Sequence, residues 1–101
     1  MTSPNYVLTL HKTYYDKGFF NLGVEVDRFV QKSGGPIKLR LGRAKRELTA
    51  KIDRNCNQNR TPRILGGPEL RNWFQENFKL KDTVVVEIVS PSELWLRKQS
   101  E

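Results

Sequence analysis

Short stretches of alternating hydrophobic and polar residues recur along the chain, and this alternation is typical of half-buried β-strands. The first, Tyr6 to Leu10, reads YVLTL, and the stretch from Glu47 to Asp53 reads ELTAKID with Leu48, Ala50 and Ile52 on one face. Strands are predicted over residues 6–10, 37–41, 47–53, 63–65, 84–89 and 94–96. In residues 84–89 only Glu87 is polar, which predicts burial on both faces of that strand.

Two segments are predicted as helices. Leu70, Trp73, Phe74 and Phe78 fall at positions i, i+3, i+4 and i+8, and Pro68 lies at the first helical position. A shorter helix is predicted over residues 27–32, before the glycine pair at 34–35. Residues 11–21, HKTYYDKGFFN, have no clean period and are predicted to form a long projecting loop or an irregular ribbon.

These elements indicate one mainly β domain that spans residues 1–101. Six or seven short strands with two short helices bury themselves most easily when the sheet curls into a barrel whose ends the helices cover. Trp73, Phe74 and Phe78 are predicted to belong to its core. No internal repeat or linker divides the chain.

The positive charge is concentrated in one quarter of the sequence. The net charge is +7, and the segment from Lys38 to Arg63 holds nine basic residues against only Glu47 and Asp53. The remaining basic and acidic residues cancel. Such a concentration is typical of a surface that binds a polyanion, although a solvated basic face without a partner would look the same.

The residue types give no catalytic machinery. His11 is the only histidine and Cys56 the only cysteine, so neither a disulfide nor a structural zinc site can be assembled within the chain. No G-x-S-x-G motif, phosphate-binding glycine loop or acid-x-Lys nuclease signature is present. We therefore expect no catalytic residues, no metal and no cofactor, and no enzyme activity from this chain by itself.

The distribution of apolar residues also bears on location. No stretch approaches the roughly 20 apolar residues that span a bilayer, and no charged-then-apolar leader opens the chain. We therefore expect a soluble cytoplasmic protein.

A polar segment from Arg54 to Arg63 combines the side chains that read bases. Arginine can donate two hydrogen bonds to guanine, and asparagine or glutamine can pair with adenine. The candidates are Arg54, Asn55, Asn57, Gln58, Asn59, Arg60 and Arg63. The alternative is an ordinary polar turn whose amides satisfy local backbone groups.

The segment from His11 to Asn21 is a second candidate. Its lysines and hydroxyls suit phosphate contacts, which position a protein without reading sequence. The candidates are His11, Lys12, Thr13, Tyr14, Tyr15 and Lys17. Its aromatic residues could instead stack on single-stranded bases, although Phe19 and Phe20 are more simply explained as anchors in the core. Further phosphate contacts are predicted for the outward cations Lys38, Arg40, Arg43, Lys45 and Lys51.

An ordered series of short motifs gives the chain a family resemblance. They are YYDKGFFN at residues 14–21, LRLG at 39–42, RILGG at 63–67 and ELRNWFQENF at 69–78. Together they resemble the B-three-type DNA-binding pseudobarrel, the recognition domain of certain type II restriction endonucleases, whose fold plant B-three transcription factors share. The resemblance extends from Val7 to Leu96.

This resemblance implies a seven-stranded open barrel whose ends are closed by two helices and which grips the major groove with two arms. By position, the N-arm would be residues 11–21 and the C-arm residues 54–63. Cleavage in the restriction enzymes belongs to a separate domain, so the chain is expected to be a recognition domain from a bacterial nuclease or a stand-alone binder. The expected partners are double-stranded DNA and a nuclease catalytic domain, and the isolated domain is expected to be a monomer.

Two other functions agree with the same residues. One is a module for single-stranded DNA or RNA that uses Tyr14 and Tyr15 as stacking surfaces. The other is a non-catalytic regulatory domain whose basic face binds an acidic protein.

Overall fold

Seven strands form a single curled sheet in the computed structural model, which describes residues 3–55 and 60–99. The elements in chain order are β1 (Asn5–Thr9), α1 (Lys12–Lys17), β2 (Phe19–Asn21), α2 (Val24–Asp27), β3 (Gly35–Leu41), β4 (Arg46–Asp53), β5 (Arg63–Leu65), α3 (Gly67–Asn77), β6 (Thr83–Ser90) and β7 (Glu93–Lys98). This mainly β, helix-capped, seven-stranded open half-barrel confirms the predicted fold class, with three helices in place of two.

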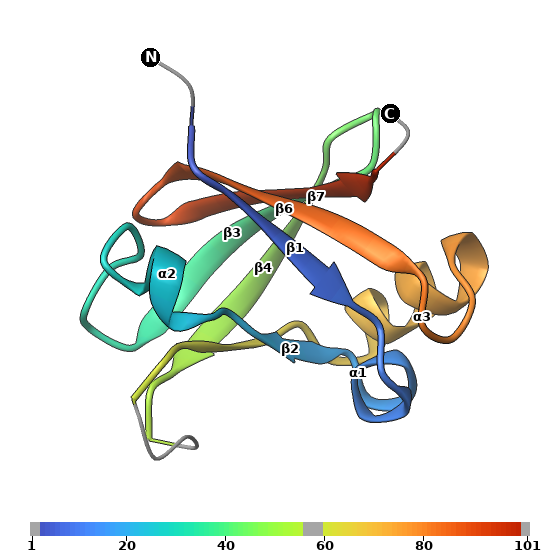
Figure 1. Ribbon diagram of the computed structural model, residues 1–101, viewed down its shortest axis with the longest axis horizontal. Helices are drawn as coiled ribbons and strands as arrows, with labels where there is room; N and C mark the ends of the chain where they lie inside the picture. The colour runs from blue at the N-terminus through green and yellow to red at the C-terminus, as the bar shows by residue number, and fades with distance from the viewer. Residues whose placement is uncertain (1–2, 56–59, 100–101) are drawn as a thin grey trace.

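The strands follow the order β1-β6-β7-β3-β4-β5-β2, so β1 and β2 are the edges of the open barrel (Figure 1). Neighbouring strands are antiparallel except for β3 and β7, where Leu39 pairs with Leu94 in a parallel register. Strands β3 and β4 form an antiparallel hairpin, with Leu39 opposite Leu48.

The barrel has two ends with different helices. The first end holds α1, α3 and the turn at residues 42–45, and the second holds α2 and the start of the C-arm (Figure 1). Strand β4 connects the two ends, from Arg46 at the first to Asp53 at the second. Seven steps of about 3.3 Å place these residues about 23 Å apart.

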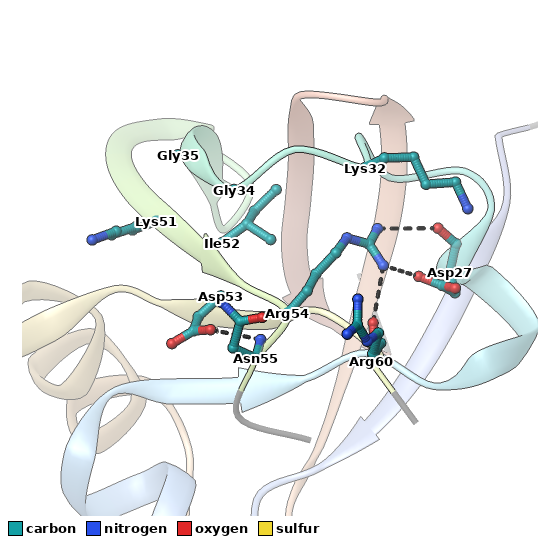
Figure 2. Close-up of a pocket in the computed structure, with 10 residues that line it drawn as sticks. All are labelled: Asp27, Lys32, Gly34, Gly35, Lys51, Ile52, Asp53, Arg54, Asn55 and Arg60. Atoms are coloured by element: carbon teal, nitrogen blue, oxygen red, sulfur yellow. Dashed lines mark hydrogen bonds and ion pairs between the residues drawn. The ribbon is translucent and has the colours of Figure 1, made fainter. Parts of the chain in front are cut away.

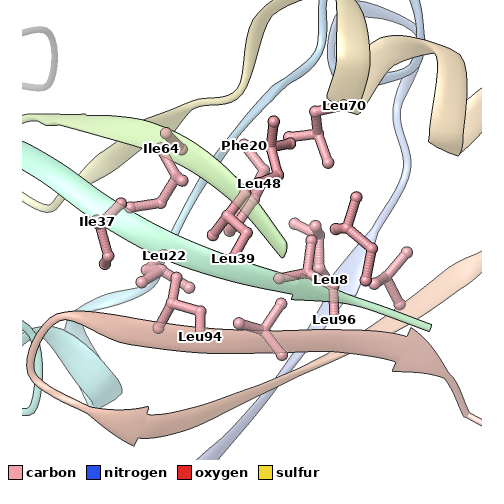
Figure 3. Packing of buried hydrophobic residues seen from close by; sticks show 14 of the residues in the cluster. Leu8, Phe20, Leu22, Ile37, Leu39, Leu48, Ile64, Leu70, Leu94 and Leu96 are labelled. Atoms are coloured by element: carbon pink, nitrogen blue, oxygen red, sulfur yellow. The ribbon is translucent and has the colours of Figure 1, made fainter. Parts of the chain in front are cut away.

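The core lies inside the curl of the sheet, where inward residues of the strands such as Ile37, Leu48 and Leu96 form one cluster with Leu70 of α3 (Figure 3). Phe20, Leu39, Ile64, Leu70 and Phe74 are completely buried. Trp73 and Phe78 also belong to this core, as predicted. Each such side chain contributes about 1.5–3 kcal/mol through removal from water, so this cluster holds the sheet in its curled form.

The prediction of a long loop over residues 11–21 is wrong, because the segment folds into α1 and β2. Its parts are too short to show the periodicity of a helix or a strand. The contacts that stabilise it come from residues distant in the sequence, because Phe20 pairs with Ile64 on β5. Tyr14 and Tyr15 pack against the core. Tertiary contacts therefore determine the structure of this segment.

Two smaller predictions also need correction. The short helix occupies Val24–Asp27 instead of residues 27–32, because its buried residue is Val26. Strand β6 is not buried on both faces: Val84, Val86 and Ile88 are buried, whereas Val89 is 44% exposed. Within the described residues, no helix is long and apolar enough to cross a membrane.

A candidate nucleic-acid interface

The outward surface of β2, β5 and the end of β4 lies between the two predicted arms. Phe20, Ile64 and Ile52 point into the core, so their neighbours point outward. These outward residues form two rows across the strands, Asn21–Arg63–Asp53 and Phe19–Leu65–Lys51. We call these six residues the arm face, because α1 leaves it at one end and the C-arm at the other.

Side-chain contacts hold the arm face in one arrangement. The Arg63 Nε donates a hydrogen bond to the Asn21 Oδ1 at 3.1 Å, and its guanidinium lies 4.6 Å from the Phe19 ring centroid. The Asn21 Nδ2 donates to the Tyr14 hydroxyl at 3.1 Å, and the Tyr14 ring meets the Phe19 ring edge-on. Arg63 therefore joins the C-arm to the N-arm, with its planar guanidinium fixed over an aromatic ring.

The N-arm is attached to the barrel mainly through its backbone. Gly18 ends α1 with a φ of 74°, and its carbonyl oxygen accepts hydrogen bonds from the N–H groups of Gly66 and Gly67 at 3.0 and 3.1 Å. Gly18 is buried, and a Cβ at this position would lie 2.2 Å from the Gly67 oxygen. Only glycine fits here, because both the positive φ and the close approach exclude a side chain.

Of the six predicted N-arm residues, the two tyrosines are partly buried and the other four are exposed. His11, Lys12, Thr13 and Lys17 are exposed, and Lys12 forms an ion pair with Asp16 one helical turn away.

Tyr14 and Tyr15 are only half-exposed, and the Gln75 Nε2 donates to the Tyr15 carbonyl oxygen at 3.1 Å. Behind them, burial raises the pKa of the Tyr6 phenol above its ordinary value, and the charges of Glu25 and Tyr14 act in the same direction.

Arg54, predicted to read a base, binds the protein itself. Its guanidinium pairs with the Asp27 carboxylate and donates to the Arg60 carbonyl oxygen at 3.2 Å (Figure 2). It also donates to the carbonyl oxygens of Val30 and Gln31 at 3.1 and 3.0 Å. Only 13% of its side chain is exposed. Arg60 and Asn55 are exposed, and the predicted residues Asn57, Gln58 and Asn59 lie outside the described part of the chain.

The described ends of the C-arm are its roots, with Arg54 and Asn55 at the near root and residues 60–63 at the far root. A hollow of about 600 Å³ lies beside Arg54, between the start of β3 and these roots (Figure 2). Lys32, Lys51 and Arg60 are among its lining residues. Over residues 3–55 and 60–99, no acidic side chain lies within ion-pair distance of any of these three cations. Asp27, Asp53 and Arg54 also line the hollow, so its charged residues carry an excess of positive charge.

The outward cations of β3 are in a different situation. The Arg40 guanidinium lies 3.2 Å from both the Glu47 and the Glu93 carboxylates, and the Lys38 amine lies 3.8 Å from Glu47. We call Lys38, Arg40, Glu47 and Glu93 the ion-paired face. Its predicted phosphate-binding cations are engaged with carboxylates of the protein.

The turn between β3 and β4 carries the remaining predicted phosphate contacts. The Lys45 amine lies 4.4 Å from the Trp95 ring centroid, and Arg43 lines a smaller hollow of about 320 Å³ over Trp73. This turn is at the first end of the barrel, about 23 Å along β4 from the C-arm root. The structure therefore divides the predicted phosphate set and leaves only Lys51 on the arm face.

Two residues of the site were missed by the sequence interpretation. Lys32 was assigned to a helix, and nothing in its local sequence indicates the hollow. Asp27 is the partner of Arg54, but 27 residues separate them along the chain. No periodicity or motif relates positions so far apart, so only the fold reveals the pair.

Comparison with known proteins gives a fold and no sequence family. No family model and no curated protein matches the chain. Its structure is similar to that of the hypothetical Arabidopsis thaliana protein At1g16640.1, a B-three-like pseudobarrel protein, with a TM-score of 0.65 and 8% sequence identity. The match covers 93% of this chain and 87% of that chain. No restriction-enzyme homologue is among the matches, so what the chain shares with known proteins is the B-three-like pseudobarrel fold.

Proposed function

We propose that the chain binds double-stranded DNA in a sequence-specific manner, with the N-arm and the C-arm flanking a major groove. The observation that carries this proposal is the arm face, whose side chains are held in one arrangement between α1 and the roots of the C-arm. Lys51 lies on that face, and Arg60 and Lys32 lie beside it without an acidic partner in the described residues. The similarity to a B-three-like pseudobarrel supports a DNA-binding function at the level of the fold.

The chemistry of the two arms supports different contacts in that complex. Lys17 and Thr13 on α1 are exposed and suit phosphate oxygens, which fix the orientation of a protein on the duplex. Arg60 at the C-arm can reach a base edge, because its side chain is exposed and arginine forms a two-pronged contact with guanine. A major groove of about 12 Å accommodates an α-helix, so α1 is small enough to lie along its rim.

Selection from a random pool of DNA duplexes at a stated salt concentration tests the proposal. The expected result is a short consensus of roughly four to seven base pairs, bound at least about a thousandfold more tightly than a scrambled duplex. Enrichment without any consensus would show that binding is electrostatic only. The log of the binding constant should fall linearly with log salt, because each neutralised phosphate releases counterions.

A single-stranded target is the second candidate, and the structure gives it less support. Stacking platforms need exposed ring faces, whereas Tyr14 and Tyr15 pack against the core and Phe19 lies beneath Arg63. Competition between single-stranded and duplex oligonucleotides of the same sequence separates the two candidates. The chain should bind the duplex more tightly, and tighter binding to the single strand would contradict the proposed duplex target.

The narrower form of the proposal is a recognition domain that acts with a separate nuclease domain, and it rests on the sequence motifs alone. In this form the chain is a monomer without catalytic residues. Purified chain incubated with its selected duplex and Mg²⁺ should protect the site from added nuclease and leave the DNA uncut. Cleavage that survives repurification would contradict it, and light scattering at assay concentration would test the monomer.

A further inference from the structure

Arg54 uses its whole guanidinium group for hydrogen bonds within the protein. All three of its guanidinium nitrogens donate: Nε to the Gln31 carbonyl, Nη1 to the Asp27 carboxylate and the Arg60 carbonyl, and Nη2 to carbonyls of Val30 and Gln31. A further contact reaches the Asp27 carbonyl at 3.5 Å. The acceptors come from the segment between α2 and β3 and from the far side of the C-arm.

These contacts leave Arg54 nothing to offer a base. A two-pronged contact with guanine uses two N–H groups, and every nitrogen of this guanidinium already donates within the protein. Moving the side chain to DNA would abandon an ion pair and four carbonyl acceptors in a site where it is 13% exposed. The cost of leaving such groups unsatisfied makes that movement unfavourable.

The contacts connect three parts of the chain that are distant in sequence. Arg54 follows the end of β4, Arg60 lies on the other side of the C-arm, and Asp27 ends α2. One side chain therefore joins the two roots of the C-arm to each other and to the body of the barrel.

We propose that Arg54 is a positioning residue that holds the two roots of the C-arm in place, and that Asp27 is its anchor. This inference rests on the proposed DNA-binding function and assigns Arg54 a role through the arm instead of through a base. Discrimination between DNA sequences then depends on an ion pair that the DNA does not touch.

Removal of the Asp27 carboxylate gives the sharpest test, because the competing explanations predict different changes in DNA affinity. Asp27→Ala raises the net charge by one, so electrostatics alone would tighten binding to every duplex. If the ion pair instead holds Arg54 away from a base, its loss would tighten binding to the selected site. The positioning role predicts a loss of about tenfold or more in the ratio of selected-site to scrambled-site affinity.

Glu76→Ala is the matched control for charge. Glu76 is exposed on α3 and has no ion-pair partner among residues 3–55 and 60–99. This variant also raises the net charge by one and should leave the affinity ratio unchanged. Both variants are measured well below their unfolding temperatures, with circular dichroism to verify the fold.

Substitutions of Arg54 itself separate positioning from phosphate contact. Arg54→Lys keeps the charge but not the planar set of five donors, and Arg54→Met removes both. Both variants should lose sequence discrimination, and Arg54→Lys should keep the wild-type salt dependence. A direct phosphate contact predicts that Arg54→Lys retains discrimination and that Arg54→Met reduces the salt slope by about one. That second pattern would overturn the proposal.

Nuclear magnetic resonance of the free protein tests the inference without DNA. In the wild type, the Arg54 Nε–H should exchange slowly with water, and in Asp27→Ala it should exchange as fast as an exposed arginine. Fast exchange in the wild type would refute the positioning role even if the chain binds a specific duplex. Slow exchange without any DNA consensus would instead refute the proposed function and, with it, a role for Arg54 in recognition.

Discussion

The two arms are attached to the barrel by different means. The N-arm is regular structure: α1 ends at Gly18, whose carbonyl oxygen accepts two backbone hydrogen bonds, and β2 continues the sheet beside β5. The near root of the C-arm is held by one side chain, the Arg54 guanidinium. At the far root, Arg63 begins β5, and the Pro62 carbonyl oxygen accepts a backbone hydrogen bond from the Leu22 N–H at 3.0 Å.

This difference indicates which arm tolerates sequence change. A backbone attachment depends on the few positions where the chain comes close to itself, so most side chains of α1 can vary without moving the arm. The near root of the C-arm depends on one arginine, so its position is determined by Asp27 and Arg54 together. In the proposed complex with DNA, we therefore expect generic contacts from the N-arm and discriminating contacts from the C-arm.

The largest effect is expected where the N-arm meets the barrel. In Gly18→Ala, a Cβ would lie 2.2 Å from the Gly67 oxygen at a φ of 74°, so the backbone must move. The left-handed strain and the overpacking together should lower the free energy of unfolding by about 2–5 kcal/mol. Chemical denaturation followed by tryptophan fluorescence measures this loss.

Gly67→Ala is the matched control. Gly67 has a φ of 71°, but no atom lies within 4 Å of the Cβ position. This variant should therefore show the cost of the strained φ alone, about 1–2 kcal/mol. Equal losses in the two variants would mean that the close approach at Gly18 does not anchor the N-arm.

The next effect concerns the C-arm and DNA. Arg60→Ala should lose about 1–3 kcal/mol of binding free energy on the selected duplex and relax discrimination at one base pair. Arg43→Ala changes the charge equally, but at the opposite end of β4, and should not change discrimination at any position. Titrations against duplexes substituted one base pair at a time measure both. A uniform loss across all duplexes for Arg60→Ala would make it a phosphate contact.

Much of the fold could be predicted because its elements carry local patterns. The alternation in β4 and the helical spacing of Leu70, Trp73 and Phe74 each place several residues on one face, and those residues are buried. The three-residue strand β2 and the helix α1 could not be predicted, since each is too short for a period. Their stability comes from β5 and α3, which follow more than 40 residues later.

The sequence indicates which segments contribute to the candidate site, but not what each side chain in them contacts. Residue type and charge indicated the segments around Lys12 and Arg54, and the structure places the arm face between them. The role of Arg54 depends on Asp27, and the neutralisation of Arg40 depends on Glu93, which is 53 residues away. Charge counted along a sequence cannot show which cations the fold has already paired.

A smaller effect follows from that pairing. Lys51→Ala and Lys38→Ala each remove one outward lysine of the same hairpin, but Lys38 lies beside Glu47 and Lys51 has no such partner among the described residues. Lys51→Ala should weaken binding to all duplexes by about 0.5–1 kcal/mol and reduce the salt slope by about one, whereas Lys38→Ala should change neither. Equal effects would show that the ion-paired face also contacts DNA.

The smallest effect is expected at the start of α1. Lys12 pairs with Asp16 at the i, i+4 spacing, and 79% of its side chain is exposed. Part of its charge is compensated within the helix, so Lys12→Ala should weaken binding to every duplex by less than Lys51→Ala does. Asp16→Asn removes the compensation and should strengthen binding slightly, with the larger gain at low salt because exposed charges are screened. Affinities of the two single variants and the double variant, measured at two salt concentrations, give the coupling between the residues. If Asp16→Asn weakens binding while α1 stays folded, the pair orients the N-arm, and the contrast between a backbone-attached arm and a side-chain-attached arm would no longer hold.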